Sequence, residues 1–454
     1  MSSEPDNPTA HRLAQWDKQY VWHPFTPMAQ WIAGEQIVIE RGEGFELIDT
    51  LGRRWIDGFG SLWCNLHGHA VPQIDQAVRE QLDKVAHSTL LGFGSVASIE
   101  LARRLVEIMP PAMRGLKKVF YSDSGATAVE VALKMAYQFY QNRGQSQRRR
   151  FVAFRDGYHG DTIGSVSLGG VDAFHQLFRP LLFEATFVDS PNPYHHPLGQ
   201  RGGQAVLAQL DEVLSANPGE YCGVFIEPLM QGAGGMLTQP PGFLRALREL
   251  TRRHDVLLIC DEVATGFCRT GKLFACEHED VCPDLLCLGK GLTGGYIPVA
   301  ATMATQEIFD AFLGEAGQER TFYHGHTFTG NALGCAAACA SIGLIFESHL
   351  PEALPAKVKL MAEYLAKLAE HPHVGDIRQC GMMAGIELVQ SRPRTFFDKT
   401  QHIGRAVCDY AARFGLIVRP LDDIIVLMPA PAMDLPTLER MMNAIVRSVE
   451  EFFE

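Results

Sequence analysis

Short apolar runs that alternate with helical patterns limit the possible folds of this chain more than any other feature of its sequence. The five runs, each bounded by turn residues, are 118–121, 151–154, 223–226, 256–260 and 285–288. Helical patterns with one apolar face lie among them, at 98–109, 127–140 and 241–253. Strands that alternate with helices form βαβ units, which build a mostly parallel sheet with helices on its faces. The sequence therefore predicts an α/β fold whose ligands bind beyond the carboxyl ends of the strands.

The length and charge of the chain restrict its partners. The 454 residues include 40 Lys and Arg against 52 Asp and Glu, which gives a net charge of −12, and 46% of the residues are hydrophobic. A chain of this composition can bury a large core in two or three domains. The acidic excess provides no general attraction to nucleic acid or to an anionic membrane, so we expect neither as a partner. An anionic ligand would need local hydrogen-bond donors.

The cysteines and the apolar stretches predict a reducing compartment. Eleven cysteines occur, and no two of them form a C-x-x-C pair, so we expect no disulfide framework and no metal site. The first ten residues lack the basic and apolar regions of a signal peptide. The longest apolar stretch, 332–346, is shorter than the ~18 residues of a membrane span. These features predict a cytoplasmic protein.

The pattern of elements changes near both ends of the chain. Residues 61–345 contain all of the predicted βαβ units and are expected to form one large domain. Residues 346–454, with helical patterns at 353–370 and 405–414 and two groups of strands, predict a small α+β domain. The first 60 residues contain strand-like segments and no βαβ unit, so we expect them to pack with the small domain.

Two glycine-rich segments resemble nucleotide-binding motifs but lack an essential part. GKGLTG at 289–294 fits G-x-G-x-x-G, yet the residues after it predict a turn and a strand where a dinucleotide site needs a helix. GFCRTGKL at 266–273 resembles a P-loop, but Leu273 stands where a Ser or Thr hydroxyl would bind Mg²⁺. Neither segment therefore predicts a nucleotide-binding enzyme.

Three strand ends carry groups that complement one another chemically. The strand at 256–260 runs into Asp261, and the strand at 285–288 runs into Lys290, which lies between two glycines. The strand at 118–121 leads to Ser124, Gly125 and Ala126 at the start of a helix, where free N–H groups can bind a phosphate. A phosphate site, a lysine amine and a buried carboxylate together suit pyridoxal 5′-phosphate (PLP): the lysine forms a Schiff base, and the carboxylate keeps the pyridine nitrogen protonated.

The segment around this lysine carries a resemblance to a known family. LLICDEVATGFCRTGKLFACEHEDVCPDLLCLGKGLTGGYIPVAA, at 257–301, resembles the signature of the class III, or omega, aminotransferases, whose fold is the PLP-dependent transferase fold type I. The resemblance implies a homodimer with active sites shared between the subunits. It also implies that Lys290 is the Schiff-base lysine and carries the proton, that Asp261 contacts the pyridine nitrogen, and that Tyr158 stacks on the ring.

The same resemblance assigns further contacts with the cofactor. Ser124, Gly125 and Ala126 would bind the phosphate. FYHGHTFTGNALGCAAA, at 322–338, would reach over from the partner subunit, with His326 and Thr327 adding phosphate contacts. Glu227 matches an acidic residue of the family near the cofactor oxygen.

Several segments resemble the branch of this family that acts in biotin synthesis, where the 7-oxo group of 8-amino-7-oxononanoate is converted to an amine. They are WHPFTPM at 22–28, DGFGSLWCNLHGH at 57–69, AHSTLLG at 86–92, FYSDSGATAVEVALKMAYQFY at 120–140, FRDGYHGDTIG at 154–164 and HGHTFTGN at 324–331. By this resemblance Trp63 would line the site for the aliphatic chain, and Arg419 would bind the carboxylate with its guanidinium fork. An alternative is another omega-aminotransferase, acting on ornithine derivatives, β-alanine or 4-aminobutyrate. The segments around Trp63 and 324–331 argue against it.

The resemblance leaves two amino donors open, S-adenosylmethionine and L-lysine. Members that use S-adenosylmethionine have HPYT, SWW and HGPTF around the substrate pocket, and a tyrosine beyond the clamping arginine. In this chain Phe25 replaces the tyrosine of HPYT, and Leu62 replaces the first tryptophan of SWW. His326, which follows Gly325, replaces the proline of HGPTF, and Val426 replaces the tyrosine beyond the arginine. Two hydroxyls and one indole are thereby lost as partners for an adenosyl group. The residues of these segments are more similar to those of the lysine-using branch. Arg269 is shared by both branches and does not distinguish them. With either donor the reaction would be ping-pong.

Overall fold

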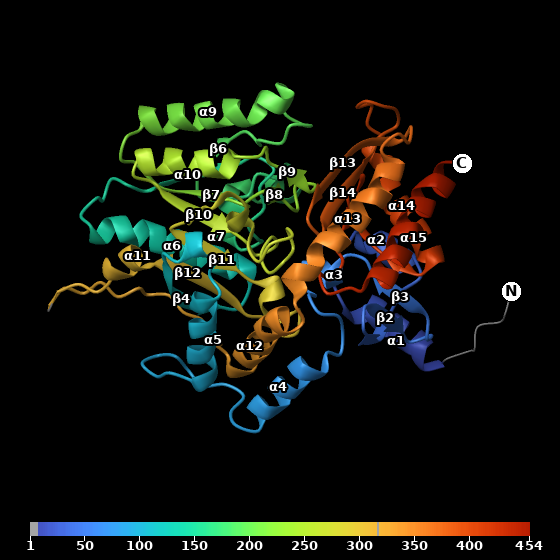
Figure 1. Ribbon diagram of the computed structural model, residues 1–454, viewed down its shortest axis with the longest axis horizontal. Coiled ribbons are helices and arrows are strands. Elements are labelled where there is room, and N and C mark those ends of the chain that lie inside the picture. The colour runs from blue at the N-terminus through green and yellow to red at the C-terminus, as the bar shows by residue number, and fades with distance from the viewer. Residues whose placement is uncertain (1–7, 316) are drawn as a thin grey trace.

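The computed structural model describes residues 8–315 and 317–454, and its largest element is a seven-stranded sheet (Figure 1). The strand order is β4-β12-β11-β10-β7-β5-β6. In that order the strands are Leu116–Ser122, Ala300–Thr305, Leu285–Leu288, Leu257–Asp261, Tyr221–Ile226, Arg150–Phe154 and Thr186–Val188. The five apolar runs of the sequence correspond to β4, β5, β7, β10 and β11, so the prediction of an α/β fold is confirmed.

All of these strands except β12 run in the same direction. β10 is parallel to β7 and β11, and β5 is parallel to β6 and β7, whereas β12 is antiparallel to both of its neighbours, β11 and β4. Every residue of β7, β10 and β11 is buried. Strands that are covered on both faces need apolar residues at every position, which is why they read as continuous apolar runs.

Helices cover both faces of this sheet. α6 (Gly125–Asn142) packs on one face, in a core that also contains Leu257 and Ile259 of β10. α5 (Val96–Glu107), α9 (Gly202–Ala216), α10 (Phe243–Arg253) and α12 (Ala332–Glu347) share the core of the other face with Leu258 and Cys260. Neighbouring residues of β10 thus point to opposite cores, as the pleat of a strand requires.

Two smaller sheets lie beside the large one, on the right in Figure 1. One contains β1 (Ile39–Glu43), β2 (Glu46–Asp49), β3 (Arg54–Asp57) and β15 (Leu416–Ile417); the other contains β13 (Val374–Cys380), β14 (Met383–Leu388), β17 (Ile424–Leu427) and β16 (Arg419–Leu421). β15 is parallel to β3, so strands from the two ends of the chain share one sheet. The domain boundaries after residues 60 and 345 stay a prediction.

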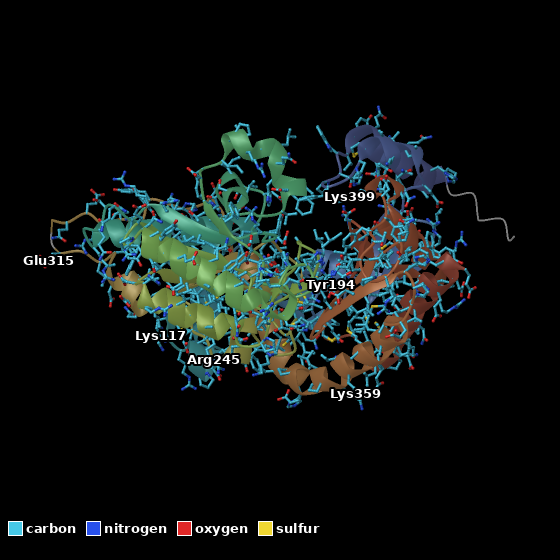
Figure 2. All side chains as sticks on the ribbon, turned by 90° about the horizontal axis from the view of Figure 1, so that it is seen from above. Lys117, Tyr194, Arg245, Glu315, Lys359 and Lys399 are labelled. Atoms are coloured by element: carbon cyan, nitrogen blue, oxygen red, sulfur yellow. The ribbon has the colours of Figure 1, made fainter. Side chains whose placement is uncertain are left out.

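The remaining elements are shorter or connect these sheets. They are α1 (Pro8–Tyr20), α2 (Met28–Ala33), α3 (Gly60–Trp63), α4 (Pro72–Leu82), α7 (Ile163–Ser167), α8 (Asp172–His175), α11 (Gln306–Asp310), α13 (Leu350–Leu368), α14 (Ile403–Ala411), α15 (Leu435–Phe453) and the hairpin of β8 (Met230–Gln231) and β9 (Leu237–Thr238). Tyr194, labelled in Figure 2, donates a hydrogen bond to the carbonyl of Pro393 (3.0 Å) and so links the large-sheet part of the chain to the β13–β17 part.

Across the part of the chain that the structure describes, no single helix is long and apolar enough to cross a membrane. The pair α12 and α13 passes that test of length and composition only together, and it is bent by 73°.

Candidate functional site

Three ionisable side chains lie at the carboxyl edge of the large sheet. Asp261 is the last residue of β10, Glu227 directly follows β7, and Lys290 follows β11 after one glycine. Since these strands are adjacent and parallel, their carboxyl ends meet at one edge, and Asp261 lies level with Cys287 near the end of β11. The structure therefore brings together the carboxylate and the lysine that the sequence analysis singled out.

Asp261 is fixed by a buried histidine. Its Oδ2 is 2.8 Å from Nδ1 of His159, and its Oδ1 accepts a hydrogen bond from the backbone N–H of Val263 at 3.0 Å. Burial disfavours the charged form of His159, but the hydrogen bond and the charge of Asp261 outweigh burial and raise the pKa of the imidazole. These two contacts fix the orientation of the Asp261 carboxyl group, which suits contact with a protonated ring nitrogen.

Glu227 is held by backbone donors instead. Its Oε1 accepts from the N–H of Tyr158 and its Oε2 from the N–H of Gly232, both at 2.9 Å. Burial raises the pKa of Glu227 to about 7, with Asp261 adding to the rise and His159 acting against it. At neutral pH this carboxyl can therefore either donate or accept a proton.

Lys290 has the properties of an amine nucleophile. Burial lowers the pKa of its ammonium, although the negative charges of Asp261 and Glu227 act in the opposite direction. A lower pKa increases the fraction of neutral amine, which is the form that attacks a carbonyl carbon. The Lys290 Nζ atom lies 4.5 Å from the centre of the Trp63 ring.

Trp63 reaches this position through an unusual left-handed turn. Gly60, Ser61, Leu62 and Trp63, the residues of α3, have φ values of 57°, 48°, 64° and 71°. The left-handed conformation costs about 1–2 kcal/mol for each residue other than glycine. The turn buries Trp63, which is 7% exposed, and leaves Leu62 at the surface with 54% exposed. Strained backbone of this kind is concentrated at functional sites.

The start of α6 forms a cradle for an anion. Ser124 caps the helix: its Oγ accepts from the N–H of Thr127, whose Oγ1 accepts from the N–H of Ser124. The N–H groups of Gly125 and Ala126 belong to the first turn and have no partner within the helix. A Cβ atom on Gly125 would lie 2.4 Å from Cγ1 of Val263, so only glycine fits here. These residues fit the phosphate of PLP, beside the loop that carries Lys290.

His326 lies next to this cradle. Its Nδ1 is 2.8 Å from Oδ2 of Asp123, the residue before Ser124. Gly325 and Thr327 on either side of it are exposed. The prediction that this segment serves the partner subunit is not tested by a single chain and stays a prediction.

Phe174 links two of the predicted site residues, Tyr158 and Phe25, and Phe25 in turn contacts Arg419. The ring of Phe174 meets Tyr158 at 6.1 Å and Phe25 at 5.4 Å, both edge to face. The Arg419 Nη2 atom donates to the carbonyl of Phe25 at 3.0 Å. Burial, together with the charge of Arg405, lowers the pKa of Arg419, but the guanidinium stays a cation at physiological pH. An aromatic row thus leads from the predicted cofactor site to a cation that suits a carboxylate.

Sequence reasoning missed several residues of this region. His159 directly follows the predicted Tyr158, but only the fold shows that it faces Asp261. Phe174 stands outside any motif. Asp57 opens the segment 57–69 that carries the resemblance, but no local signal shows what its side chain contacts. Met428 was also missed: it packs in one apolar cluster with the predicted residues Trp63 and Val426.

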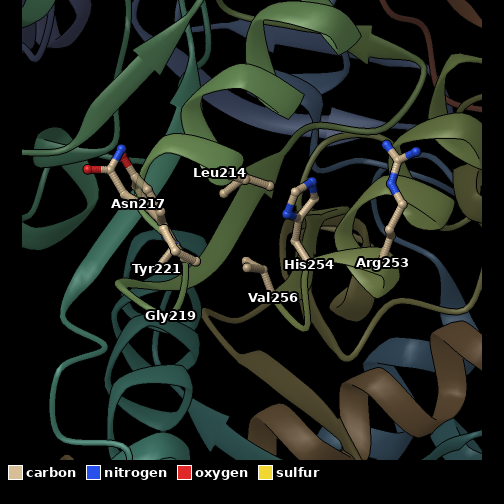
Figure 3. A pocket seen from close by; sticks show the side chains of 8 residues that line it. Leu214, Asn217, Gly219, Tyr221, Arg253, His254 and Val256 are labelled. Carbon is tan, nitrogen blue, oxygen red and sulfur yellow. The ribbon is translucent and has the colours of Figure 1, made fainter.

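Two other features of the described residues were considered as binding sites, a metal-ligand cluster and a surface cavity. Among residues 8–315 and 317–454, no three His, Cys, Asp or Glu side chains are grouped so that they could hold a metal ion. A shallow cavity of about 220 Å³, shown in Figure 3, is lined by Tyr221 at the start of β7 and by His254 and Val256 before β10. It lies at the opposite edge of the sheet from Asp261 and contains none of the predicted site residues.

Comparison with known proteins agrees with this geometry. Residues 28–449 match the model of a family described as aminotransferase class-III. The chain is 48% identical over 450 residues to an adenosylmethionine-8-amino-7-oxononanoate aminotransferase of Geobacter sulfurreducens, covering 98% of each chain, and 50% identical over 440 residues to one of Nitratidesulfovibrio vulgaris, covering 96% and 81%.

Solved structures give the same relationship. The crystal structure of adenosylmethionine-8-amino-7-oxononanoate aminotransferase from Methanocaldococcus jannaschii is 41% identical, with a TM-score of 0.92, and the match covers 97% of this chain and 99% of that one. An omega transaminase from Pseudomonas jessenii, solved in complex with PMP, is 28% identical with a TM-score of 0.90 over 97% and 98% of the two chains.

Proposed function

Because this chain belongs to the class-III aminotransferase family, we propose that it converts the 7-oxo group of 8-amino-7-oxononanoate to an amine in biotin synthesis. Members of this family use PLP. The observation that carries the proposal is the meeting of Lys290, Asp261 and the start of α6 at one sheet edge, in a chain whose relatives at 41–50% identity are named for this reaction.

The side chains of the site divide the work of the reaction. When bound, PLP supplies an electron sink that lets a hydrogen on the donor carbon leave as a proton. The Nζ atom of Lys290 would attach the cofactor, and as a free amine the same atom would carry that proton. Asp261 keeps the pyridine nitrogen protonated, and His159 orients Asp261. Ser124 and the N–H groups of Gly125 and Ala126 would bind the phosphate, and His326 and Thr327 would add contacts from a second copy of the chain.

The substrate residues form an apolar site that ends in a cation. Trp63 and Phe25 offer apolar surface to the aliphatic chain of the oxo acid, with Leu62 and Gly325 at the border of the site. The guanidinium of Arg419 binds the terminal carboxylate, since its fork matches two carboxylate oxygens. Tyr158, whose backbone is fixed by Glu227, covers the cofactor ring.

We propose S-adenosylmethionine as the amino donor, because the relatives described above carry it in their names. L-Lysine is the second candidate. It is favoured by Phe25, Leu62, His326 and Val426, which lack the hydroxyls and the indole that an adenosyl group would use.

The two half-reactions, followed one after the other, test the donor and the function. The purified PLP form is mixed separately with S-adenosylmethionine, L-lysine, L-ornithine and L-alanine, and the absorbance change to the pyridoxamine form is followed. S-Adenosylmethionine should convert the cofactor, and subsequent addition of 8-amino-7-oxononanoate should restore the starting spectrum. Conversion by alanine or ornithine alone, with no recovery on addition of the oxo acid, would contradict the proposed function.

We also propose that the protein is a homodimer and that it acts in the cytoplasm. The segments 91–99 and 323–328 expose large apolar side chains and are taken together as one apolar surface. These side chains are Leu91, Phe93, Val96, Ile99, Tyr323 and Phe328. The residues just before the first segment lie near the second, since the rings of His87 and Phe328 are 4.9 Å apart. This surface is next to His326 and the phosphate cradle, so a second copy of the chain that covers it would lie at the active site.

A further inference from the structure

Asp57 forms contacts that the proposed reaction does not use. It is the last residue of β3, it is 3% exposed, and both of its carboxylate oxygens are occupied by the left-handed turn. Oδ1 accepts from the backbone N–H of Ser61 at 2.9 Å, and Oδ2 accepts from the hydroxyl of Ser61 at 2.7 Å. The Nε2 atom of His69 lies 3.1 Å from Oδ2 and restricts the carboxylate further.

The turn needs such support because three of its four residues are unsuited to it. Ser61, Leu62 and Trp63 all have a Cβ atom and positive φ, so a right-handed or extended backbone would be their preferred state. The N–H of Trp63 donates to the carbonyl of Phe59 at 3.0 Å, and these backbone bonds alone do not select the left-handed form. The two hydrogen bonds that Ser61 donates to the Asp57 carboxylate are specific to the observed geometry.

The turn determines where the Trp63 indole lies. In the observed conformation the indole faces the Nζ of Lys290 and also closes over Gly232, where an added Cβ atom would meet the ring at 3.2 Å. Trp63 packs in an apolar cluster with Met230, Val426 and Met428. If the backbone of residues 61–63 returned to ordinary φ values, the indole would leave both Lys290 and this cluster.

We propose that Asp57 is a positioning residue for the reaction: its carboxylate holds the left-handed turn at 60–63 and thereby places the Trp63 indole as the wall against which the aliphatic oxo acid binds. The effect on substrate rests on the proposed function, whereas the effect on the turn does not. Asp57 touches neither the reacting atoms nor the cofactor residues and acts only through Ser61.

The first experiment measures the turn without any substrate. Amide hydrogen exchange is followed by mass spectrometry in the peptide 58–66 of the apoprotein, for the wild type, Asp57→Ala and the milder Ser61→Ala. Exchange should be roughly tenfold faster in Asp57→Ala and less accelerated in Ser61→Ala. Asp49→Ala is the matched control, because Asp49 is 1% exposed, ends the neighbouring β2 and binds the N–H groups of Leu51 and Arg53. Unchanged exchange in the peptide 58–66 of Asp57→Ala would overturn the proposal.

The second experiment measures the substrate. The KM for 8-amino-7-oxononanoate should rise about tenfold in Asp57→Ala while kcat changes little, because Asp57 contacts neither Lys290 nor Asp261. The double variant Asp57→Ala/Ser61→Gly should recover part of the KM, since glycine adopts positive φ without a Cβ penalty. Faster exchange with an unchanged KM would refute the role in substrate binding, and equal losses in Asp57→Ala and Asp49→Ala would reduce Asp57 to a structural residue. If the wild type does not aminate the oxo acid, the proposed function fails, and the exchange result still decides the role of Asp57 in the turn.

Discussion

The two buried carboxyl groups near Lys290 have different hydrogen-bond partners. Asp261 meets the imidazole of His159, whose raised pKa favours a cation at that position, whereas Glu227 meets only backbone N–H groups. Burial without a hydrogen-bonded cation makes the Glu227 carboxyl easier to protonate, which is why its pKa is raised. The pair therefore supplies one carboxyl group held against His159 and one group that titrates near neutral pH.

The raised pKa of Glu227 predicts a pH-dependent cost to folding. Because its pKa of about 7 in the folded protein exceeds the usual 4.5, this group binds a proton more tightly in the folded state. Its contribution to the free energy of unfolding is therefore intact below about pH 4.5 and falls as the pH rises toward 7. We expect Glu227→Gln to gain stability relative to the wild type across this range, by at most about 3 kcal/mol. Urea unfolding of both apoproteins at several pH values measures the difference, and a constant difference would contradict the assignment.

Lys290 is predicted to be the one site at which PLP attaches covalently. Treatment of the PLP-loaded wild type with borohydride should fix one cofactor per chain on the Nζ of Lys290, and Lys290→Ala should acquire none. Intact-mass and peptide mass spectrometry measure the label. Lys357→Met is the control, because Lys357 is also a buried lysine with a lowered pKa, but its Nζ is bound to the carbonyl of Pro431. Loss of the label in Lys357→Met with retention in Lys290→Ala would reverse the assignment.

Among the elements, the start of α6 forms a predicted phosphate site because two other segments of the site pack against its first turn. Its first turn lies against Val263, which follows Asp261, and against Gly289, which precedes Lys290. The absence of a side chain at Gly125 allows the helix to come this close. One glycine thus sets the distance between the phosphate cradle, the lysine loop and the carboxylate.

We predict that Gly125→Ala weakens PLP binding roughly tenfold, because its Cβ would push the first turn of α6 away from Val263 and displace the N–H donors. Titration of the apoprotein with PLP, followed by absorbance, measures the affinity. Gly343→Ala in the middle of α12 is the control: its Cβ would meet only side-chain ends of Glu347 and Arg104 at 3.4 Å and 3.6 Å. That variant should keep the affinity and melt at a slightly higher temperature. Equal affinities in the two variants would disprove the role of Gly125.

The elements also differ in how far the sequence predicts them. The buried strands β7, β10 and β11 could be located because complete burial leaves only apolar residues, and the groups at their ends followed from parallel order. The three-residue strand β6 is too short to form a pattern. The left-handed turn of α3 could not be predicted, because Ser, Leu and Trp give no signal for positive φ and the supporting hydrogen bonds come from Asp57. The pairing of His159 with Asp261 joins residues that are far apart in the chain.

At the scale of the whole molecule, the apolar surface of the segments 91–99 and 323–328 predicts a dimer. Phe93 and Val96 are 71% and 87% exposed, so replacing both with Asp should hardly affect the fold of one chain but should prevent a second copy from binding. Sedimentation at micromolar concentration should show a dimer for the wild type and a monomer for Phe93→Asp/Val96→Asp. Leu198→Asp, at a residue that is 48% exposed in another segment, should stay dimeric. A dimeric double variant would place the interface elsewhere.

The pairing of β3 with β15 has a consequence for how a cell makes this molecule. The partner of Ile56 in the parallel ladder is Leu416, about 360 residues later. At the usual speed of ribosomes this interval corresponds to about 20 to 70 seconds, during which the edge of β3 has left the exit tunnel but its neighbour does not yet exist. The nascent chain therefore carries an open strand edge through most of its translation, and an unpaired edge of this kind is prone to pair with another chain.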